Sequence, residues 1–248
     1  MAMIETVDAC EASRRCQGLP LEQRLLILAD TTAPLAPHTT FLASQDGIAA
    51  RFDGFNVPVI VAAGREPEPL GQLIDRLRRQ DEECTVCLHE TVPVPAWLEA
   101  GFVSRDTWMV RPTLGVQRRG KAVPLTDPAQ LLELYRQAGT GFWTPRMLKF
   151  GHYWGILGSG GALLAAAGVH FILPDRSYAQ LGGVATLPSE RGRGYASTCI
   201  TNVLAGLAET NIPICGLFAD RSAELLLGFY RRLAFAVQGH YRFFMLKP

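Results

Sequence analysis

The sequence of 248 residues lacks an apolar run long enough to cross a membrane, and it carries almost no net charge. A membrane helix needs about 18 or more consecutive apolar residues. The formal net charge of +1 gives no general attraction to nucleic acid or to an anionic membrane. The N-terminal residues also lack the basic and then apolar segments of a signal peptide. We therefore expect a cytoplasmic protein with no nucleic-acid or membrane partner.

The cysteine pattern does not indicate a disulfide framework. The six cysteines are Cys10, Cys16, Cys84, Cys87, Cys199 and Cys215. In a cytoplasmic chain of this length we expect them to be free thiols. The spacing of Cys84, Cys87 and His89 could suggest a metal site. However, residues three apart in a strand point to opposite faces, and no second ligand pair follows, so four ligands cannot be assembled. We expect no metal site.

The composition is that of a well-packed globular protein, with 48% apolar and 19% charged residues. Segments with strand and helix patterns alternate along the chain, which predicts an α/β (α+β) fold. Residues 113–120 are polar, basic and contain glycine. We place a domain boundary there, with domains at residues 1–117 and 118–248.

The two halves repeat the same order of elements. In the first half the predicted strands and helices are residues 57–62, 70–79, 84–88 and 96–100. In the second half they are residues 181–187, 195–208, 214–219 and 223–232. Each series is followed by an aromatic corner, Phe102 or Phe235, and by a strand that ends next to Pro112 or Pro248. We interpret the pattern as an internal duplication of roughly 120 residues.

The most informative stretch is residues 178–196. An apolar run ends at Leu187, Pro188 stops it, and the loop Arg191-Gly-Arg-Gly-Tyr-Ala196 follows before a long helical pattern. Glycines allow consecutive backbone N–H groups to point into one concavity. The start of the helix adds the positive end of its dipole, and arginines can donate charge-assisted hydrogen bonds. The stretch predicts a phosphate site, most simply for a pyrophosphate.

Three interpretations of this loop compete. It could be a solvated arginine-glycine turn. It could be a dinucleotide site, but Ser197 stands where the third glycine of that motif belongs, and only about 50 residues follow, too few for most of a doubly wound sheet. It could also bind the pyrophosphate of coenzyme A. The corresponding slot of the first half, residues 64–69, has two prolines without N–H groups and two acids. We expect that slot not to bind a nucleotide.

The residues that carry a family resemblance are the run 183–196 and the segment Phe229-Tyr-Arg-Arg-Leu-Ala-Phe235. Together with the helix and strand between them, they resemble the GNAT superfamily of acetyl-CoA-dependent N-acetyltransferases, most closely the branch with an FR47-like C-terminal half. The resemblance covers residues 121–248. The first half is similar only in layout, so the resemblance implies two GNAT-like halves in tandem, with a degenerate first half. Two departures are Ala234 in place of the usual glycine and Asp220–Ala223 where an asparagine is often found.

The resemblance implies acetyl-CoA as the cofactor and assigns residues to it. The expected cofactor-binding residues are Val184, Ala185, Thr186, Arg191, Gly192, Arg193, Gly194, Tyr195, Ala196 and Ser197. A backbone N–H of the strand, aimed at the acetyl carbonyl, would stabilise an oxyanion. Tyr230 matches the tyrosine that protonates the leaving thiolate, although it could equally be a packed core residue. His170 and Glu190 are candidates for the base, with a structural histidine and a solvated loop acid as the alternatives.

We therefore expect an N-acetyltransferase that moves an acetyl group to a primary amine by direct attack. The acceptor is a small molecule or a peptide amine, and the sequence does not identify it. The alternative is a non-catalytic acyl-CoA-binding or sensor protein. O-acetyl transfer and longer acyl chains also remain open.

Overall fold

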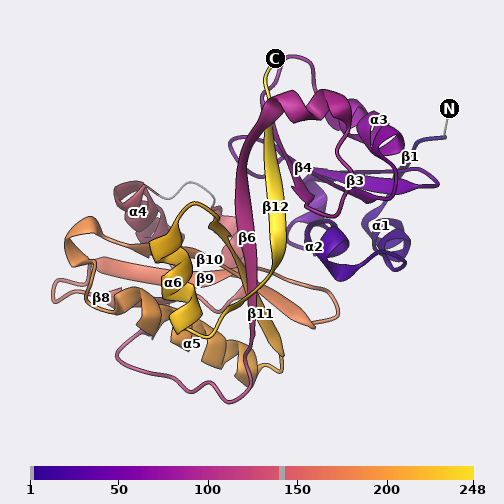
Figure 1. Cartoon of the computed structure of the whole chain (residues 1–248). Coiled ribbons are helices and arrows are strands. Elements are labelled where there is room, and N and C mark those ends of the chain that lie inside the picture. The colour runs from indigo at the N-terminus through magenta and orange to yellow at the C-terminus, as the bar shows by residue number, and fades with distance from the viewer. Residues whose placement is uncertain (1–2, 140–142) are drawn as a thin grey trace. The chain divides into compact units, whose positions relative to one another are not determined.

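The computed structural model describes residues 3–139 and 143–248. The chain forms two compact units, coloured along the sequence in Figure 1. The first unit contains Met1–Trp108, Ala219–Leu227 and Val237–Pro248, and the second contains Met109–Phe218 and Gly228–Ala236. Both units are discontinuous in sequence. The predicted division at residue 117 stays a prediction.

The first unit is a sheet with helices on both faces (Figure 1). Its helices are α1 (Ala9–Cys16), α2 (Leu21–Asp30), α3 (Pro67–Leu77) and the 3-10 helices η1 (Ala36–His38) and η2 (Ala96–Gly101). Its strands are β1 (Glu5–Val7), β2 (Thr39–Ala43), β3 (Gly47–Phe52), β4 (Val59–Gly64), β5 (Cys84–His89), β12 (Ala236–Leu246) and the first part of β6 (Phe102–Pro112). The strand order is β1-β2-β3-β4-β5-β12-β6.

Local sequence signals explain much of this unit. The Asp46-Gly47 dipeptide is a hairpin signal in the sequence, and β2 and β3 do pair antiparallel around it, with Ser44 N donating to Gly47 O at 2.9 Å. The predicted helix over residues 70–79 is also confirmed as α3. Its apolar positions are all buried against the sheet, namely Leu70, Leu73, Ile74 and Leu77.

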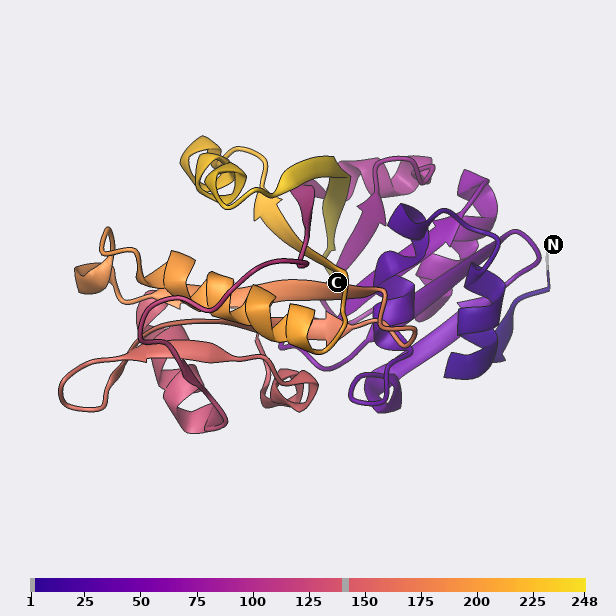
Figure 2. The ribbon, with the colours of Figure 1, turned by 90° about the horizontal axis from the view of Figure 1, so that it is seen from below.

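The second unit contains the stretch that the sequence singled out. Its helices are α4 (Pro128–Ala138), α5 (Tyr195–Glu209), the end of α6 (Glu224–Arg232) and the 3-10 helices η3 (Pro145–Phe150) and η4 (Pro188–Glu190). Its strands are β7 (Val123–Pro124), β8 (Trp154–Leu157), β9 (Leu163–Ile172), β10 (Tyr178–Thr186), most of β11 (Ile214–Asp220) and the end of β6. The order is β6-β11-β10-β9-β8-β7. Helices α4 and α5 cover opposite faces of β8–β10 (Figures 1 and 2).

The two units share a parallel strand pair of the same kind. In the first unit β4 and β5 are paired from Val59↔Thr85 to Val61↔Cys87, and in the second β10 and β11 are paired from Tyr178↔Ile214 to Gln180↔Gly216. Strand β12, the last of the chain, pairs with β5 in the first unit, whereas the end of β6 lies beside β11 in the second. The equivalent strands of the two sequence halves are thus exchanged. This arrangement supports the predicted duplication.

The polar segment predicted as a linker is packed along α5. Asn202 Nδ2 donates to Arg119 O at 2.6 Å. Arg118 Nε donates to Glu209 at 2.9 Å, and its guanidinium lies 4.1 Å from the centre of the Trp154 ring. Residues 113–120 therefore belong to the compact second unit.

Two helices differ from what the sequence predicts, namely α1 near the N-terminus and η3 before β8. Helix α1 was not predicted, because its surface is polar; it is held by the Asp8 cap and by the Glu11 carboxylate, which accepts from Arg14 and Arg15. The sequence also predicts a short helix over residues 143–148 capped by Thr144; Thr144 does stand at the N-cap of η3, but its side chain makes no capping hydrogen bond. Its Oγ1 is buried and has no hydrogen-bond partner.

The expectations about cysteines, metal ligands and membrane helices apply to the chain as a whole. The thiols are unpaired, and burial raises the pKa of Cys84 and Cys87. Within residues 3–139 and 143–248, no group of three or more His, Cys, Asp or Glu side chains is placed to hold a metal ion. In the same part of the chain, no helix has the length and apolar character to span a membrane.

Asp30, at the end of α2, makes stability depend on pH. Its side chain is buried, and burial raises the pKa of the carboxyl from 3.8 to about 8. The unfolded chain loses this proton near pH 4. The folded state therefore binds more protons between pH 4 and pH 8, and the free energy of unfolding falls as the pH rises through that window.

We expect Asp30→Asn to abolish this fall in the free energy of unfolding as the pH rises. The variant should gain stability relative to the wild type as the pH rises from 5 to 8, by at most about 1.4 kcal/mol per pH unit. Urea denaturation of both proteins at several pH values measures the difference. A difference that stays constant with pH would contradict the assignment.

Candidate active site

Strand β10 separates from β11 in the middle of the sheet. The parallel pairing of the two strands ends at Gln180↔Gly216, and no later pair joins them. Beyond this point the backbone of β10 faces a gap rather than a neighbouring strand. The predicted cofactor-binding residues Val184, Ala185 and Thr186 all lie on this separated part.

A β-bulge interrupts β10 on its other side. Gly182 pairs with Gly168 and Ala185 with Ala166, so Gly183 and Val184 fall between paired residues. Gly183 has a φ of +56°, which a side chain would strain. The bulge was not predicted, although two successive glycines within a strand pattern could have indicated it.

The predicted phosphate loop follows β10 through η4. Gly192 and Gly194 have φ values of 79° and 77°, and Gly194 is the N-cap of α5. In the described part of the chain, the backbone N–H groups of residues 192–197 donate to no protein acceptor. These N–H groups and the positive end of the α5 dipole form a site suited to an anion.

The two arginines of the loop differ in their partners. Arg193 pairs with Glu190 at 3.2 Å. Arg191 is exposed and forms no ion pair with any described residue. The Ser197 hydroxyl donates to Gly194 O at 2.7 Å and so stabilises the turn. Arg191 is therefore the side chain most available for a phosphate.

The corresponding loop of the first unit has lost this donor set. Helix α3 begins at Pro67 and has Pro69 in its first turn, so two of its first backbone nitrogens carry no hydrogen. Glu66 stands at the N-cap and Glu68 in the first turn, where both disfavour phosphate. The expectation that this loop binds no nucleotide stays a prediction with a physical basis.

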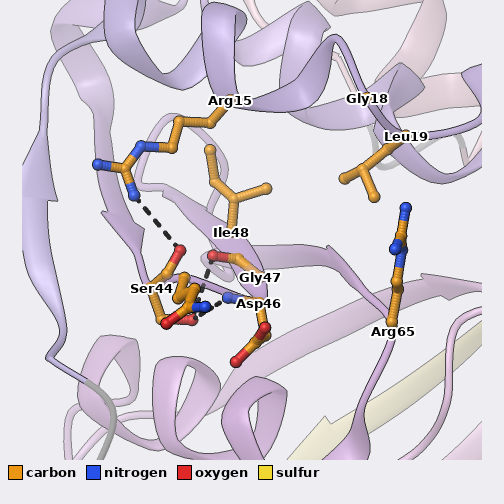
Figure 3. Close-up of a pocket in the computed structure, with 9 residues that line it drawn as sticks. Arg15, Gly18, Leu19, Ser44, Asp46, Gly47, Ile48 and Arg65 are labelled. Atoms are coloured by element: carbon orange, nitrogen blue, oxygen red, sulfur yellow. Dashed lines mark hydrogen bonds between the residues drawn. The ribbon is translucent and has the colours of Figure 1, made fainter.

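A pocket of about 280 Å³ lies near that loop in the first unit (Figure 3). Arg65 lines one side of it and Arg15 the other. Arg15 donates to Ser44 O at 3.3 Å and pairs with Glu5 and Glu11, so its charge is already compensated. Asp46 adds a negative charge to the lining. The pocket lacks the electropositive character of the α5 loop.

Tyr230 lies on α6, which follows the strand that separates from β10. The ring is buried, 5.2 Å from Phe229 and 6.0 Å from Phe235 between ring centres. Burial raises the pKa of its hydroxyl to about 12, so the group is protonated at neutral pH. No described residue hydrogen-bonds to this hydroxyl.

The turn after Tyr230 explains one departure from the family pattern. Tyr230 O accepts from Leu233 N at 3.0 Å and from Phe235 N at 3.1 Å. Ala234 therefore adopts a φ of 63°, the left-handed conformation that glycine prefers at a helix end. Alanine keeps the geometry at a cost of about 1 kcal/mol.

His170 lies on β9 beside the bulge. Its ring packs on Gly182, where an added Cβ would lie 2.3 Å from ring atoms. The Nε2 atom is buried and has no hydrogen-bond partner. Burial lowers the pKa of His170 to about 4, so the ring is neutral at neutral pH. The other candidate base, Glu190, is held by Arg193 in the loop.

Comparison with known proteins agrees with this geometry. Residues 126–235 match the model of the acetyltransferase (GNAT) family. No curated protein matches the sequence of the chain. Residues 126–235 thus form a domain of the GNAT acetyltransferase family.

Solved structures show the same fold. A Drosophila protein aligns with a TM-score of 0.70 at 11% identity, over 99% of each chain. A tandem GNAT protein from the clavulanic acid biosynthesis pathway aligns with a TM-score of 0.65 at 14% identity, over 99% of this chain and 98% of its own. A protein described as a GNAT acetyltransferase from Novosphingobium aromaticivorans aligns with a TM-score of 0.61 at 24% identity, over 80% and 88%. The predicted fold, with two GNAT-like halves in tandem, is confirmed.

Enzymes of this family take the acetyl group from acetyl-CoA, which is the cofactor of this domain. The residues present fit it. The free N–H groups of residues 192–197 match a pyrophosphate, and the gap beside Val184–Thr186 offers unpaired strand backbone to an extended arm.

Arg191→Glu tests the phosphate loop. We expect it to weaken the binding of CoA by about 10-fold or more, because a charge-assisted hydrogen bond contributes about 1.5–3 kcal/mol and the new carboxylate repels phosphate. The measurement is calorimetric titration with CoA.

Arg65→Glu is the matched control, since Arg65 lies in the corresponding loop of the first unit. Its affinity for CoA should equal that of the wild type. Unaltered binding in Arg191→Glu, or equal weakening in both variants, would overturn the assignment of the loop.

Proposed function

We propose that the protein transfers the acetyl group of acetyl-CoA directly to the primary amine of a small molecule or peptide, with Tyr230 as the proton donor to the departing thiolate. The observation that carries the proposal is the run of free N–H groups at the start of α5, placed directly after a strand with open backbone. This combination suits an extended thioester with a diphosphate at one end.

Binding and positioning fall to residues of one continuous segment. Residues 191–197 hold the diphosphate, and the backbone of Val184–Thr186 binds the arm in the gap beyond Gln180. When bound, acetyl-CoA supplies an activated acetyl group. The bulge matters here because the N–H of Val184 is not committed to a paired position and can donate to a carbonyl oxygen. A donor aimed at a developing oxyanion contributes several kcal/mol to catalysis.

Tyr230 supplies the proton that the departing thiolate needs. Its hydroxyl is protonated at neutral pH because burial raises its pKa to about 12. With no protein acceptor among the described residues, the O–H is available to a leaving sulfur. The hydroxyl first stabilises the thiolate by donating a hydrogen bond and then gives it the proton. Tyr230 afterwards regains a proton from solvent.

We assign His170 as the residue that orients the attacking amine and accepts its proton. A free amine has a pKa of about 10 and must be neutral to attack. The neutral imidazole offers its unpartnered Nε2 as an acceptor or, in the other tautomer, its N–H as a donor. As an acceptor it orients the amine and takes its proton once the N–C bond has formed, when that proton has become acidic.

The finer expectations about the protein remain proposals. We propose a cytoplasmic location, an FR47-like C-terminal half and a structural first half over residues 1–117. A non-catalytic acyl-CoA sensor is the outcome that a failed transfer assay would favour.

Tyr230→Phe tests the proton donor. We expect kcat to fall by roughly 100-fold, in the range of a lost acid catalyst, while the Kd for CoA stays unchanged, because the ring packing is preserved. Steady-state kinetics with a panel of amines, together with titration of CoA, separates the two effects. Unchanged turnover would exclude Tyr230 as the proton donor.

His170→Gln tests the base. The neutral form of His170 persists down to about pH 4 because its pKa is lowered. We therefore expect kcat to fall by on the order of 10- to 100-fold at pH 7–8, and the deficit to shrink as the pH approaches 4, where the wild-type ring also becomes protonated.

His89→Gln is the matched control. His89 is also buried, also has an unpartnered Nε2 and also has a lowered pKa, but it lies in the first unit. Its kcat profile should follow the wild type. A deficit in His170→Gln that is absent or independent of pH would exclude the role.

A further inference from the structure

We propose that Tyr135 is a positioning residue that fixes the bulge of β10 and thereby aims the N–H of Val184. The inference rests on the proposed acetyl transfer for its catalytic consequence. Its structural part stands on the contacts of Tyr135 alone. Tyr135 lies on α4, on the face of β8–β10 opposite to α5 (Figures 1 and 2).

The contact on which the proposal rests is a buried hydrogen bond. Tyr135 Oη donates to Gly183 O at 2.9 Å. The Tyr135 side chain is only 3% exposed, and burial raises the pKa of its hydroxyl well above 10. The O–H therefore remains a donor at any pH at which the protein works. A carbonyl that has left the sheet ladder would otherwise be buried without a partner.

The fit of Tyr135 to Gly183 is also steric. A Cβ added to Gly183 would lie 2.4 Å from Tyr135 Oη, and the φ of +56° disfavours any side chain. The hydroxyl thus occupies space that only glycine leaves open. His170 Nε2 would be 3.6 Å from the same point, so the proposed base and Tyr135 both flank the bulge.

The direction of the Val184 N–H follows from peptide geometry. In a trans peptide the C=O of one residue and the N–H of the next point in opposite directions. The described residues contain no cis peptide bond. By holding the Gly183 carbonyl toward α4, Tyr135 turns the N–H of Val184 away from α4. No ladder pair fixes this peptide otherwise, since Gly183 and Val184 lie between paired residues.

Other aromatic rings hold Tyr135 itself in place. The Trp143 ring lies 5.2 Å from the Tyr135 ring, and Trp143 Nε1 donates to Tyr153 Oη at 3.1 Å. Tyr153 packs on Gly168, where an added Cβ would lie 2.1 Å from the ring. Gly168 is the strand partner of Gly182. The cluster therefore connects α4 to both strands at the bulge.

Tyr135→Phe removes one hydroxyl and keeps the ring. We expect kcat to fall by about 10- to 100-fold, because a misaimed oxyanion donor loses most of its effect. The Kd for CoA should change by less than about 3-fold, because the loop of residues 191–197, which we assign to the diphosphate, is untouched. Gly183→Ala should lower kcat similarly, since its Cβ displaces the Tyr135 hydroxyl.

Tyr153→Phe is the matched control. It removes a hydroxyl that bonds to Trp143 rather than to Gly183, and it keeps the packing of the rings that holds Tyr135 in place. Its kcat should stay within about 2-fold of the wild type. If Tyr135→Phe and Tyr153→Phe lose activity equally, the effect is that of general packing and the positioning role is overturned.

Amide hydrogen exchange over residues 182–187 tests the structural part without an activity assay. Exchange should be faster in Tyr135→Phe than in the wild type and unchanged in Tyr153→Phe. Equal exchange in all three proteins would overturn the proposal. If the wild type transfers acetyl to no amine, the proposed function fails, whereas faster exchange in Tyr135→Phe alone still supports Tyr135 as the residue that holds the bulge.

Discussion

The interruption of β10 is the constraint on which the second unit depends. The strand loses its partner on one side after Gln180 and breaks its register on the other side at Gly183. Unpaired backbone groups in a buried strand are costly, so each must find another partner. Tyr135 satisfies the Gly183 carbonyl. The strand then leads through Pro188 to the loop that we propose for the diphosphate.

The two units share one framework but differ at the start of the helix that follows the first strand of the parallel pair. Both contain a short parallel strand pair whose two strands are connected through a glycine and a helix. The start of α5 keeps every backbone N–H, whereas Pro67 and Pro69 remove two from α3. Because β12 completes the sheet of the first unit and the end of β6 joins the second, each half of the sequence needs the last strand of the other. This exchange gives the first half a structural role that does not depend on a nucleotide site.

Burial sets the charge state of three side chains of the second unit, Tyr135, His170 and Tyr230. Desolvation keeps Tyr135 and Tyr230 protonated and His170 neutral at neutral pH. These groups therefore act as hydrogen-bond donors or acceptors without net charge. The positive charge comes from Arg191 and the α5 dipole, both at the exposed end of the site. An uncharged reaction centre beside a cationic loop suits a thioester that carries its phosphates at the far end.

The sequence by itself determined the strand–helix–strand–helix order of residues 57–100 and 181–232, the amphipathic face of α3, the Asp46-Gly47 hairpin and the glycine loop before α5, because each signal lies within a few neighbouring residues. Only the tertiary structure decided the bulge at Gly183, its bond to Tyr135, the packing of His170 on Gly182 and the exchange of β6 and β12. Tyr135 and Gly183 are 48 residues apart, and no local pattern links them. Such contacts arise when separate segments pack together, so composition and periodicity do not carry them.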